Sequence, residues 1–517
     1  MNIPKLEKVK VRDIKYKIGD KKYGYDVLPI EERKKVLLLS DDMRMFSGIA
    51  NVSKQLVLGT AHRYNYVQLG AAIKHPEYGK VIDISNDVSN LASISDSSVK
   101  IYANNGYGNQ QIIRDLINRE NPDIIVHFTD PRQWLWLYEM EHEIRQIIPL
   151  GYLNIWDSIP DPQYNETFYA SCDLLMSISK QTYGINKRVL ERFGENPIDI
   201  DDIKDDSEFT NILNYVPHGI DNELFKKYDE THKEYKEYKN RISEQFPNKK
   251  FTILWNNRNI NRKKPGDVIL AYRAFCEMND VKSEDCLLIM HTAMIDGNGT
   301  NLQEVVDALC PDYDILFIEQ KTPPPAMPFL YNLADVTINI ASNEGFGLAT
   351  AESIMCETPI IVNVTGGLQD QCGFENDNGE ILTFKDYMGD WASNHDGRYK
   401  KHGDWVVPVY PTNRSLNGSP PTPYISDDRC SFEDVAKALH KVYKTKPAKR
   451  KQMGKSGREY FMSKESKLNV GDMCAEYIKS IDTTIDKVSK RNRFSMYKID
   501  NNGDTRSVNM LKYNLGK

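Results

Sequence analysis

The chain has 517 residues, a formal net charge of −6 at pH 7, and 40% hydrophobic and 27% charged residues. This length holds two or three domains with large buried cores, and the composition is ordinary for a soluble protein. Because the chain has no overall basic excess, its charge argues against a protein whose main task is to grip nucleic acid, although it leaves room for a local basic groove.

The N-terminus and the cysteines predict a cytoplasmic protein. Met1–Asp20 is rich in Lys, Glu and Asp, so we do not expect a signal peptide. No apolar run reaches the length that spans a membrane. The eight cysteines are scattered, without a C-x-x-C pair or a metal-ligand spacing, so we expect reduced, mostly structural thiols and no metal site.

The first half of the chain predicts an α/β domain at residues 34–222, preceded by a polar extension at residues 1–33. The domain begins with the buried strand Lys35–Ser40. Further strands alternate with helices, and we expect these strands at residues 66–70, 80–84, 123–128, 152–155 and 174–178. Such alternation indicates a parallel sheet with helices on both faces, whose ligands bind beyond the carboxyl ends of the strands.

The second half predicts another α/β domain at residues 250–445, after a charged linker at residues 223–249. Its first strand is Phe251–Trp255. Residues 384–428 form an insertion that is too long for an ordinary loop, with one strand-like piece at Trp405–Tyr410, and we expect it to cover a binding cleft. Helices follow over residues 446–487, and residues 488–517 form a polar tail.

The most informative stretch lies within the second domain. Val336–Ile340 is a β-branched strand, Ser342–Gly347 a glycine-rich turn, Leu348–Met355 a helix and Ile360–Val364 the next strand, which ends at Gly366-Gly367. A glycine loop that feeds a helix N-terminus presents free backbone N–H groups and the positive end of a helix dipole. This arrangement suits a phosphate.

Two carboxylates flank that predicted phosphate seat, Glu344 in the turn and Glu352 in the helix. A carboxylate only accepts hydrogen bonds, so it suits the vicinal hydroxyls of a sugar ring. A phosphate bracketed by two sugars describes a nucleotide-sugar. The alternative is that Glu344 is a solvated loop acid and that Glu352 stabilises the N-terminus of its own helix.

The sequence from Glu344 to Glu352, EGFGLATAE, resembles the E-x7-E motif of retaining glycosyltransferases of the GT-B fold, especially family four, or group 1. The resemblance covers about residues 34–480. It implies two Rossmann-like parallel-sheet domains that face a central cleft, with C-terminal helices that cross back to the first domain. It also implies a hexosyl- or pentosyltransferase of EC class 2.4 that retains anomeric configuration, takes an NDP-sugar, preferably a UDP-sugar, and needs no metal or other cofactor.

The resemblance also implies which residues act on the donor. Arg258 and Lys263 correspond to the cations that clasp the diphosphate and stabilise the charge that develops on it; the alternative is plain surface charge. Lys264 stands where the family commonly has Gly, which leaves open which lysine clasps. The full implied donor site comprises Gly48, Arg258, Lys263, Glu344, Gly345, Phe346, Gly347, Leu348, Ala349, Glu352, Gly366 and Gly367.

Candidate residues also lie at strand ends of the first domain. His127 closes its strand, and the resemblance implies contact with the transferred sugar, although a strand-end histidine is often a core residue. We expect the acceptor near Asp130, Arg132, Asp157 and Asp161, whose alternative role is that of solvated loop residues. His218 stands where the family usually has Asn.

The acceptor is left open by the sequence. A glycan or another hydroxyl acceptor is the default. The segments SDDMR, SGIA, LGTAH and HFTDPR also resemble, more loosely, glycosyltransferases of large tailed bacteriophages. This resemblance implies DNA with a hydroxymethylated base as an alternative acceptor, in the cytoplasm of a host. A third alternative is a non-catalytic scaffold that binds a nucleotide-sugar or a partner through the insertion. The sequence does not indicate an oligomeric state.

Overall fold

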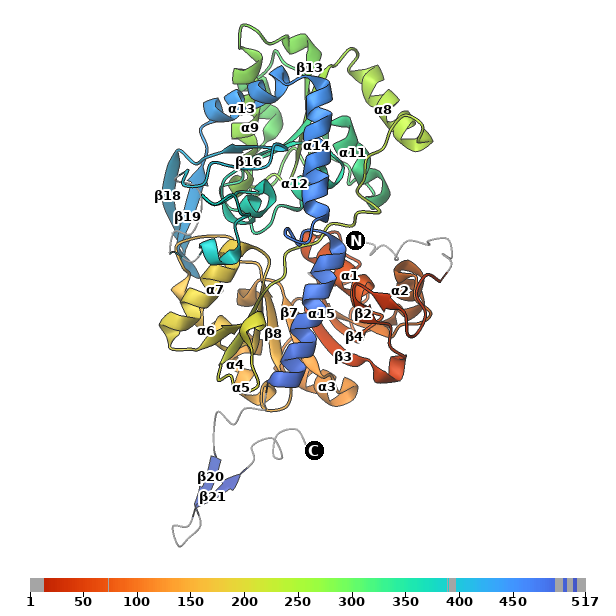
Figure 1. The fold of residues 1–517 in the computed structure, drawn as a ribbon, viewed down its shortest axis with the longest axis vertical. Coiled ribbons are helices and arrows are strands. Elements are labelled where there is room, and N and C mark those ends of the chain that lie inside the picture. Colours follow the sequence, from red (N-terminus) through yellow and green to blue (C-terminus); the bar gives the residue numbers. More distant parts are fainter. Residues whose placement is uncertain are drawn as a thin grey trace.

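The computed structural model describes residues 14–72, 74–387, 389 and 397–488, together with the backbone of the strands β20 (Met496–Ile499) and β21 (Thr505–Val508). Two α/β domains lie one above the other, the first below and the second above (Figure 1). Residues 1–13, part of the predicted insertion and most of the predicted polar tail lie outside the described residues.

The first domain is built on a nine-stranded sheet of order β10-β11-β9-β8-β7-β3-β4-β6-β5. All neighbouring strands are parallel except β5, which runs antiparallel to β6. The strands are β3 (Lys34–Asp41), β4 (Tyr64–Ala72), β5 (Val81–Asp83), β6 (Val99–Asn105), β7 (Ile124–Phe128), β8 (Leu150–Asn154), β9 (Leu174–Ser177), β10 (Pro197–Asp199) and β11 (Asn211–Tyr215).

Helices cover both faces of this sheet, as predicted. Along β3, Val36 and Leu38 belong to one buried cluster and Leu37 and Leu39 to another, because successive side chains of a strand point to opposite faces. The helices are α1 (Gly48–Thr60), α2 (Ser85–Ala92), α3 (Gln110–Glu120), α4 (Leu135–Glu139), α5 (Glu141–Ile144), α6 (Glu166–Ala170) and α7 (Lys180–Phe193).

The second domain has a six-stranded, fully parallel sheet of order β14-β13-β12-β15-β16-β17. Its strands are β12 (Phe251–Asn256), β13 (Cys286–His291), β14 (Ile315–Ile318), β15 (Val336–Asn339), β16 (Ile360–Asn363) and β17 (Val406–Val409). Its helices, with the linker helix α8, are α8 (Lys233–Gln245), α9 (Pro265–Cys276), α10 (Leu302–Leu309), α11 (Met327–Leu333), α12 (Leu348–Met355), α13 (Phe432–Lys444) and α14 (Pro447–Met462). Two Rossmann-like parallel-sheet domains are therefore confirmed.

The chain ends its described body by crossing between the domains. Helix α14 packs on α12 in the second domain, and α15 (Val470–Lys487) then lies along the first domain beside α1 (Figure 1). Tyr64, which is fully buried, donates its hydroxyl proton to Asp482 of α15 at 2.7 Å, and Arg63 donates to the same carboxylate at 2.8 Å. The predicted return of the C-terminal helices is thus made by α15.

The segment before β3 packs on the first domain, which differs from the predicted extension outside the core. Its short strands β1 (Lys21–Lys22) and β2 (Tyr25–Asp26) pair with each other, and Val27 is 1% exposed. Arg33 donates to the backbone carbonyls of Leu28 and Ala61. A buried guanidinium with carbonyl acceptors fixes this segment to α1 and β4.

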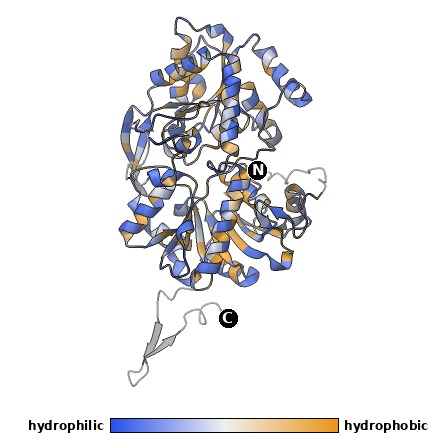
Figure 2. Cartoon of the chain, in the orientation of Figure 1, coloured by the Kyte–Doolittle hydropathy of each residue, from blue (hydrophilic) through white to orange (hydrophobic). Residues whose placement is uncertain are grey.

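The insertion contains an element that the sequence did not predict. After the edge strand β17, the strands β18 (Asn413–Ser419) and β19 (Thr422–Arg429) form an antiparallel hairpin. Figure 2 shows this hairpin as largely hydrophilic, whereas the strands inside each domain are mostly hydrophobic. In Figure 1 it reaches from the upper domain toward the lower one.

Two further features bear on the predictions. All eight cysteines are buried and none is in a disulfide, in keeping with the predicted structural thiols. Among the helices of the described residues, none combines the length and the apolar character needed to cross a membrane.

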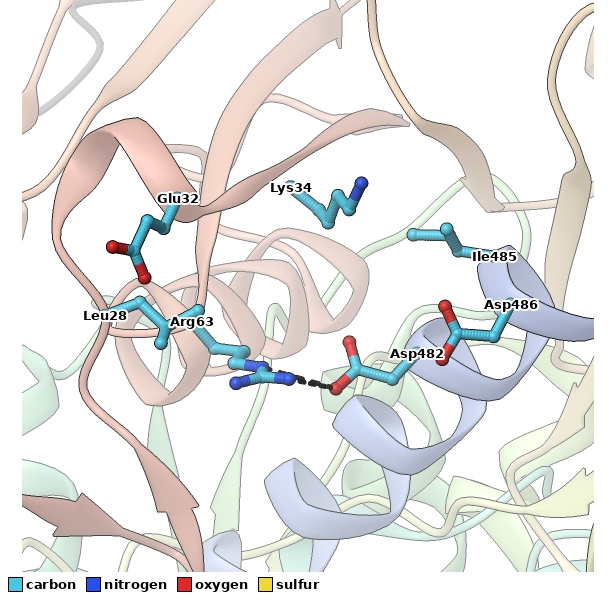
Figure 3. Close-up of a pocket in the computed structure, with 7 residues that line it drawn as sticks. All are labelled: Leu28, Glu32, Lys34, Arg63, Asp482, Ile485 and Asp486. Atoms are coloured by element: carbon cyan, nitrogen blue, oxygen red, sulfur yellow. Dashed lines mark hydrogen bonds and ion pairs between the residues drawn. The ribbon is translucent and has the colours of Figure 1, made fainter.

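The contact of α15 with the first domain generates a stability prediction. Figure 3 shows Arg63 and Asp482 paired at the edge of a hollow of about 140 Å³. In Asp482→Ala, Arg63 loses its carboxylate acceptor and the buried Tyr64 hydroxyl keeps only its 3.1 Å hydrogen bond to the Ile478 carbonyl, which costs about 1–3 kcal/mol of unfolding free energy. The melting temperature should fall by about 2–4 °C per kcal/mol.

Differential scanning calorimetry measures this loss, and Asp486→Ala is the control. Asp486 also lines the hollow, but no described residue forms a hydrogen bond or ion pair with it. Equal melting temperatures of the two variants would show that the Asp482 contacts do not hold α15 in place.

Candidate functional site

The predicted motif forms a loop between β15 and the N-terminus of α12. Gly347 immediately precedes the helix with φ +91°, a left-handed conformation that favours glycine. No side chain caps α12. The first backbone N–H groups of this helix, from Leu348 on, therefore lack intrahelical acceptors and carry the positive end of the helix dipole.

The other glycines of the motif permit a tight contact between segments. A Cβ atom on Gly345 would lie 2.9 Å from Ile178 of the first domain, and one on Gly367 would lie 2.2 Å from the Gly345 carbonyl oxygen. The backbone N–H of Gly367 donates to the Glu344 carbonyl at 2.8 Å. The glycine pair Gly366-Gly367 thus packs against the motif loop itself, and its predicted contact with a donor sugar stays a prediction.

The centre of the site is a buried ion pair between two segments of the second domain, the one after β12 and the one after β15. Lys263, 8% exposed, donates to the carboxylate of Glu344, which is also 8% exposed. Arg262 lies beside them, with Nη1 at 3.9 Å from Glu344. Burial alone would raise the pKa of Glu344, but the charges of Lys263 and Arg262 outweigh it and hold the pKa below its ordinary value.

Arg258 is not part of this pair. Its side chain is 63% exposed, and its Nε donates to Asp296 at 2.7 Å in the loop after β13. The nearest guanidinium to Glu344 that the structure describes as an ion pair is that of Arg262, which the sequence did not single out. Arg262 also donates to the Asn343 carbonyl at 2.7 Å. The predicted role of Arg258 stays a prediction.

Glu352 lies at the start of a chain of polar side chains. The hydroxyl of Tyr331 donates to Glu352 at 2.5 Å and accepts from Asn256 at 2.6 Å. Asn256 in turn contacts His291 at 2.7 Å. Burial raises the pKa of Glu352 to about 7, although the Tyr331 hydrogen bond opposes the rise. Among the described residues no cation pairs with this carboxyl group, in contrast to Glu344.

The two domains meet at the motif. A Cβ atom on Gly48, at the N-terminus of α1, would lie 3.6 Å from Leu348, at the N-terminus of α12. Asp157 of the first domain lies 3.7 Å from Arg262 of the second. The N-termini of two helices and an interdomain ion pair are thereby brought to one place, beyond the carboxyl ends of both sheets.

His127 is placed as a core residue. It is fully buried, and its two ring nitrogens contact the hydroxyls of Tyr138 at 2.7 Å and Thr129 at 2.9 Å. Its ring stacks on Tyr152 at 5.1 Å. Both nitrogens are already satisfied, so the geometry favours the alternative of a structural histidine over contact with a sugar.

His218 is the histidine that reaches the motif. It is 6% exposed and packs between Phe128 of β7 and Phe346 of the motif loop, with ring centroids at 5.8 and 5.2 Å. Its Nδ1 has no partner among the described residues. The position was visible in the sequence as a substitution in the family segment, but its contact with Phe346 was not.

The four predicted acceptor residues differ in their partners. Asp130 holds Arg132 through two hydrogen bonds, at 2.6 and 2.8 Å. Asp161 is buried and accepts from Arg188 at 2.6 and 2.9 Å, which makes it a structural residue. Asp157 is half-buried and is the one of the four that faces Arg262.

The β18–β19 hairpin joins the two domains from outside. The Ser426 backbone N–H donates to the Ile159 carbonyl at 2.8 Å. The backbone N–H of Gln163 donates to the Tyr424 hydroxyl at 3.0 Å, and the Tyr164 hydroxyl donates to the Tyr424 carbonyl at 2.9 Å. The hairpin belongs to the second domain, yet it holds the loop after β8 of the first.

The same hairpin holds the motif loop. Asn343 donates to the Ser426 carbonyl at 2.6 Å and to the Ser158 hydroxyl at 3.0 Å. The Ser342 hydroxyl donates to Asp427 at 2.9 Å. Because Asn343 precedes Glu344 directly, the hairpin fixes the backbone on which the buried ion pair depends.

The described residues contain no group of three or more His, Cys, Asp or Glu side chains placed to hold a metal ion. The cations of the site are the side chains of Lys263 and Arg262.

Comparison with known proteins gives one family match and one curated relative. Residues 236–388 match the family model of glycosyl transferases group 1. The chain is 31% identical over 126 residues to D-inositol 3-phosphate glycosyltransferase from Thermomonospora curvata. The aligned region spans 24% of this chain and only 29% of that relative.

Solved structures resemble the whole two-domain body. The α,α-trehalose 6-phosphate synthase of Burkholderia multivorans has a TM-score of 0.58 at 10% identity and covers 89% of this chain. HepE of Anabaena, in complex with UDP and glucose, has a TM-score of 0.57 at 10% identity and covers 87% of this chain. Sucrose-phosphate synthase of Thermosynechococcus elongatus has a TM-score of 0.56 at 13% identity and covers 88% of this chain. Each of these three structures is aligned over 100% of its own chain. The predicted GT-B fold is confirmed.

The double contact of Asn343 generates a prediction about local order. Asn343→Ala removes the donor to both Ser426 and Ser158, so the motif loop and the hairpin keep only the contacts of Ser342. Hydrogen-exchange mass spectrometry should show about ten-fold faster amide exchange in residues 157–165 and 413–429, as expected when about 1.4 kcal/mol of local stability is lost. Leu416→Ala, at a hairpin position that is 67% exposed, is the control. Unchanged exchange in both segments would mean that the hairpin does not depend on Asn343.

Proposed function

We propose that this protein is a glycosyltransferase that moves a sugar from an NDP-sugar to an acceptor hydroxyl with retention of anomeric configuration. The observation that carries the proposal is the buried Lys263–Glu344 pair beside the uncapped N-terminus of α12, opposite the N-terminus of α1. The match of residues 236–388 to group 1 glycosyl transferases supports it.

The donor is held by the second domain in this proposal. The amide groups at the start of α12 and the Lys263 ammonium bind the diphosphate, Glu344 accepts hydrogen bonds from the transferred sugar, and Glu352 accepts them from the ribose. As the bond from sugar to phosphate breaks, negative charge grows on the diphosphate. Fixed cations and a helix N-terminus that already point at it stabilise that charge without reorganisation.

Arg262 takes the guanidinium role in this proposal. It already lies between Glu344 and Asp157, whereas Arg258 would have to leave Asp296 to reach the same place. Lys263 and Arg262 together supply the positive charge, and no further cofactor is part of the proposed reaction. A UDP-sugar is the preferred donor, and the structurally similar HepE of Anabaena is known in complex with UDP-glucose.

Retention is proposed to proceed by front-face attack. Glu344 is bound by Lys263, so its carboxylate is not free to attack the anomeric carbon as the nucleophile of a double displacement. The acceptor hydroxyl then approaches on the face that the diphosphate leaves, and the departing phosphate oxygen takes its proton.

The first functional prediction tests whether Lys263 or Lys264 holds the diphosphate. Lys263→Ala should lower kcat at least about 100-fold, which is about 2.7 kcal/mol of lost transition-state stabilisation. Lys264→Asn is the control, because Lys264 has φ +53°, which Asn tolerates, and contacts Asp427 rather than Glu344. NDP release is measured with each donor. If Lys264→Asn loses turnover and Lys263→Ala keeps it, the diphosphate is held by the other lysine.

The raised pKa of Glu352 predicts pH-dependent donor binding. Ribose hydroxyls donate to the carboxylate form, so binding favours deprotonation. Affinity should be fully present above pH 7 and fall as the pH drops through about 7, where Glu352 takes up a proton. Isothermal titration with an NDP-sugar from pH 5.5 to 8.5 measures this fall.

Glu352→Gln provides the comparison, because an amide does not titrate in this range. The variant should bind the NDP-sugar more weakly above pH 7 and show a flat pH profile. A wild-type affinity that is constant or rises toward pH 5.5 would contradict the role of Glu352 at the ribose.

The donor itself is identified by a thermal-shift panel of UDP-, GDP-, ADP- and TDP-sugars. Binding to the folded state alone raises the melting temperature in proportion to the logarithm of ligand concentration over Kd. A shift with one nucleotide names the donor, and the absence of any shift would argue against the proposed function as a whole.

A further inference from the structure

The aspartates at the carboxyl ends of β3, β7 and β8 are not equivalent. Asp42 is bound by Arg44 and His75, Asp130 by Arg132, and Asp161 by Arg188, while Asp157 faces Arg262. Asp41 is the exception among these five. Its described partner is the hydroxyl of Ser47, which donates to it at 2.7 Å.

Asp41 lies where the two domains meet. It is the last residue of β3, and Ser47, which it holds, caps α1 by accepting from the Ala50 backbone N–H. The next residue, Gly48, approaches Leu348 at the start of α12. A half-buried carboxylate that no cation of the described residues pairs with thus stands beside the helix termini that form the proposed donor site. Burial raises its pKa, and the Ser47 hydroxyl only partly opposes the rise.

Tyr107 lies at the same edge of the sheet, because it follows β6 and packs on Trp134 of the segment after β7. The negative charges of Asp41 and Asp130 act on its hydroxyl and, after burial, raise its pKa. The ring is half-buried and meets Trp134 edge to face at 5.7 Å. Trp134 is fully buried, and its indole N–H has no acceptor among the described residues. A buried N–H group without an acceptor leaves a hydrogen bond that the described residues do not supply.

The arginines of the same edge are already engaged. Arg44 donates to Asp42 and to Glu77 at 2.8 Å, and Arg132 donates to Asp130 while its guanidinium lies over Trp156. Among the described residues of these strand ends, the groups left to meet a ligand are therefore a carboxylate, a phenol and aromatic rings. Such groups accept hydrogen bonds from hydroxyls and pack on sugar rings, and they repel a phosphate.

We propose that the acceptor is an uncharged polyhydroxylated molecule of the glycan type, one of whose hydroxyls donates to Asp41 while its ring packs on Tyr107. This inference rests on the proposed glycosyltransferase function and specifies its second substrate. Asp41 is an acceptor-binding residue in this arrangement. A sugar phosphate or a DNA backbone would bring its negative charge against Asp41.

The experiment supplies the full chain with the donor found by the thermal-shift panel and compares three classes of acceptor. These are neutral glycosides with free hydroxyls, the corresponding sugar phosphates, and duplex DNA that contains hydroxymethylated bases. NDP release above the rate without acceptor is measured. The expected result is stimulation by neutral glycosides, at least about ten-fold stronger in kcat/KM than by sugar phosphates or DNA, a difference of about 1.4 kcal/mol. Equal or stronger stimulation by either charged class would overturn the proposal.

Asp41→Asn tests the residue directly. Asn keeps an oxygen for Ser47 but removes the charge, so the melting temperature and the donor-induced thermal shift should be kept. The kcat/KM for the neutral acceptor should fall at least about ten-fold. Wild-type kcat/KM in this variant would overturn the role of Asp41.

Tyr107→Ala provides a second test if Asp41→Asn does not fold. It removes the ring without touching the carboxylate and should raise the acceptor KM at least about five-fold with little change in kcat. An unchanged acceptor KM would overturn the proposal. A donor that gives no thermal shift with the wild-type chain would instead count against the glycosyltransferase function, so the two failures are distinguishable.

Discussion

The Lys263–Glu344 pair is the interaction on which the rest of the site depends. A buried ion pair gains little stability, because removing two charges from water costs about as much as their attraction returns. Its value lies in position: the ammonium is held at Glu344, in the loop that leads into α12, and the N-terminus of that helix also carries positive potential. Two sources of positive potential at one place favour the binding of an anion. The ion pair with Glu344 keeps the Lys263 ammonium in position when no anion is bound.

Close backbone contact makes this pair possible. The loop that carries Glu344 lies against Ile178 on one side and against Gly367 on the other, at distances that a side chain at Gly345 or Gly367 would prevent. The β18–β19 hairpin then fixes the same loop through Asn343 and Ser342. The motif is therefore held by three segments that are far apart in sequence, and its geometry belongs to the assembled domains.

The fold followed from patterns that are local. Strand alternation, the glycine turn at Ser342–Gly347 and the β15–α12–β16 unit were predicted because each depends on neighbouring residues. The partners of the site were not, since Arg262 and Asn343 gain their roles from tertiary contacts. The β18–β19 hairpin was missed because its residues are mostly polar, whether exposed as in β18 or partly buried as in β19, so they lack the apolar alternation that marks a strand. His127 and His218 show the same limit: strand position suggested the first, whereas only packing shows that the second meets Phe346.

The two faces of the site carry opposite charge, and this asymmetry orders the proposed reaction. The second domain offers Lys263, Arg262 and a helix N-terminus, whereas the first offers Asp41 and the Tyr107 ring. In the proposed function, a diphosphate is attracted to the wall of the second domain and disfavoured by the Asp41 carboxylate, which gives the donor one favourable orientation. A neutral polyol feels no such repulsion and can hydrogen-bond to the acidic wall. Under this proposal electrostatics separates the two substrates by domain, and the hydroxyl bound at Asp41 would meet the sugar at the boundary where α1 and α12 approach.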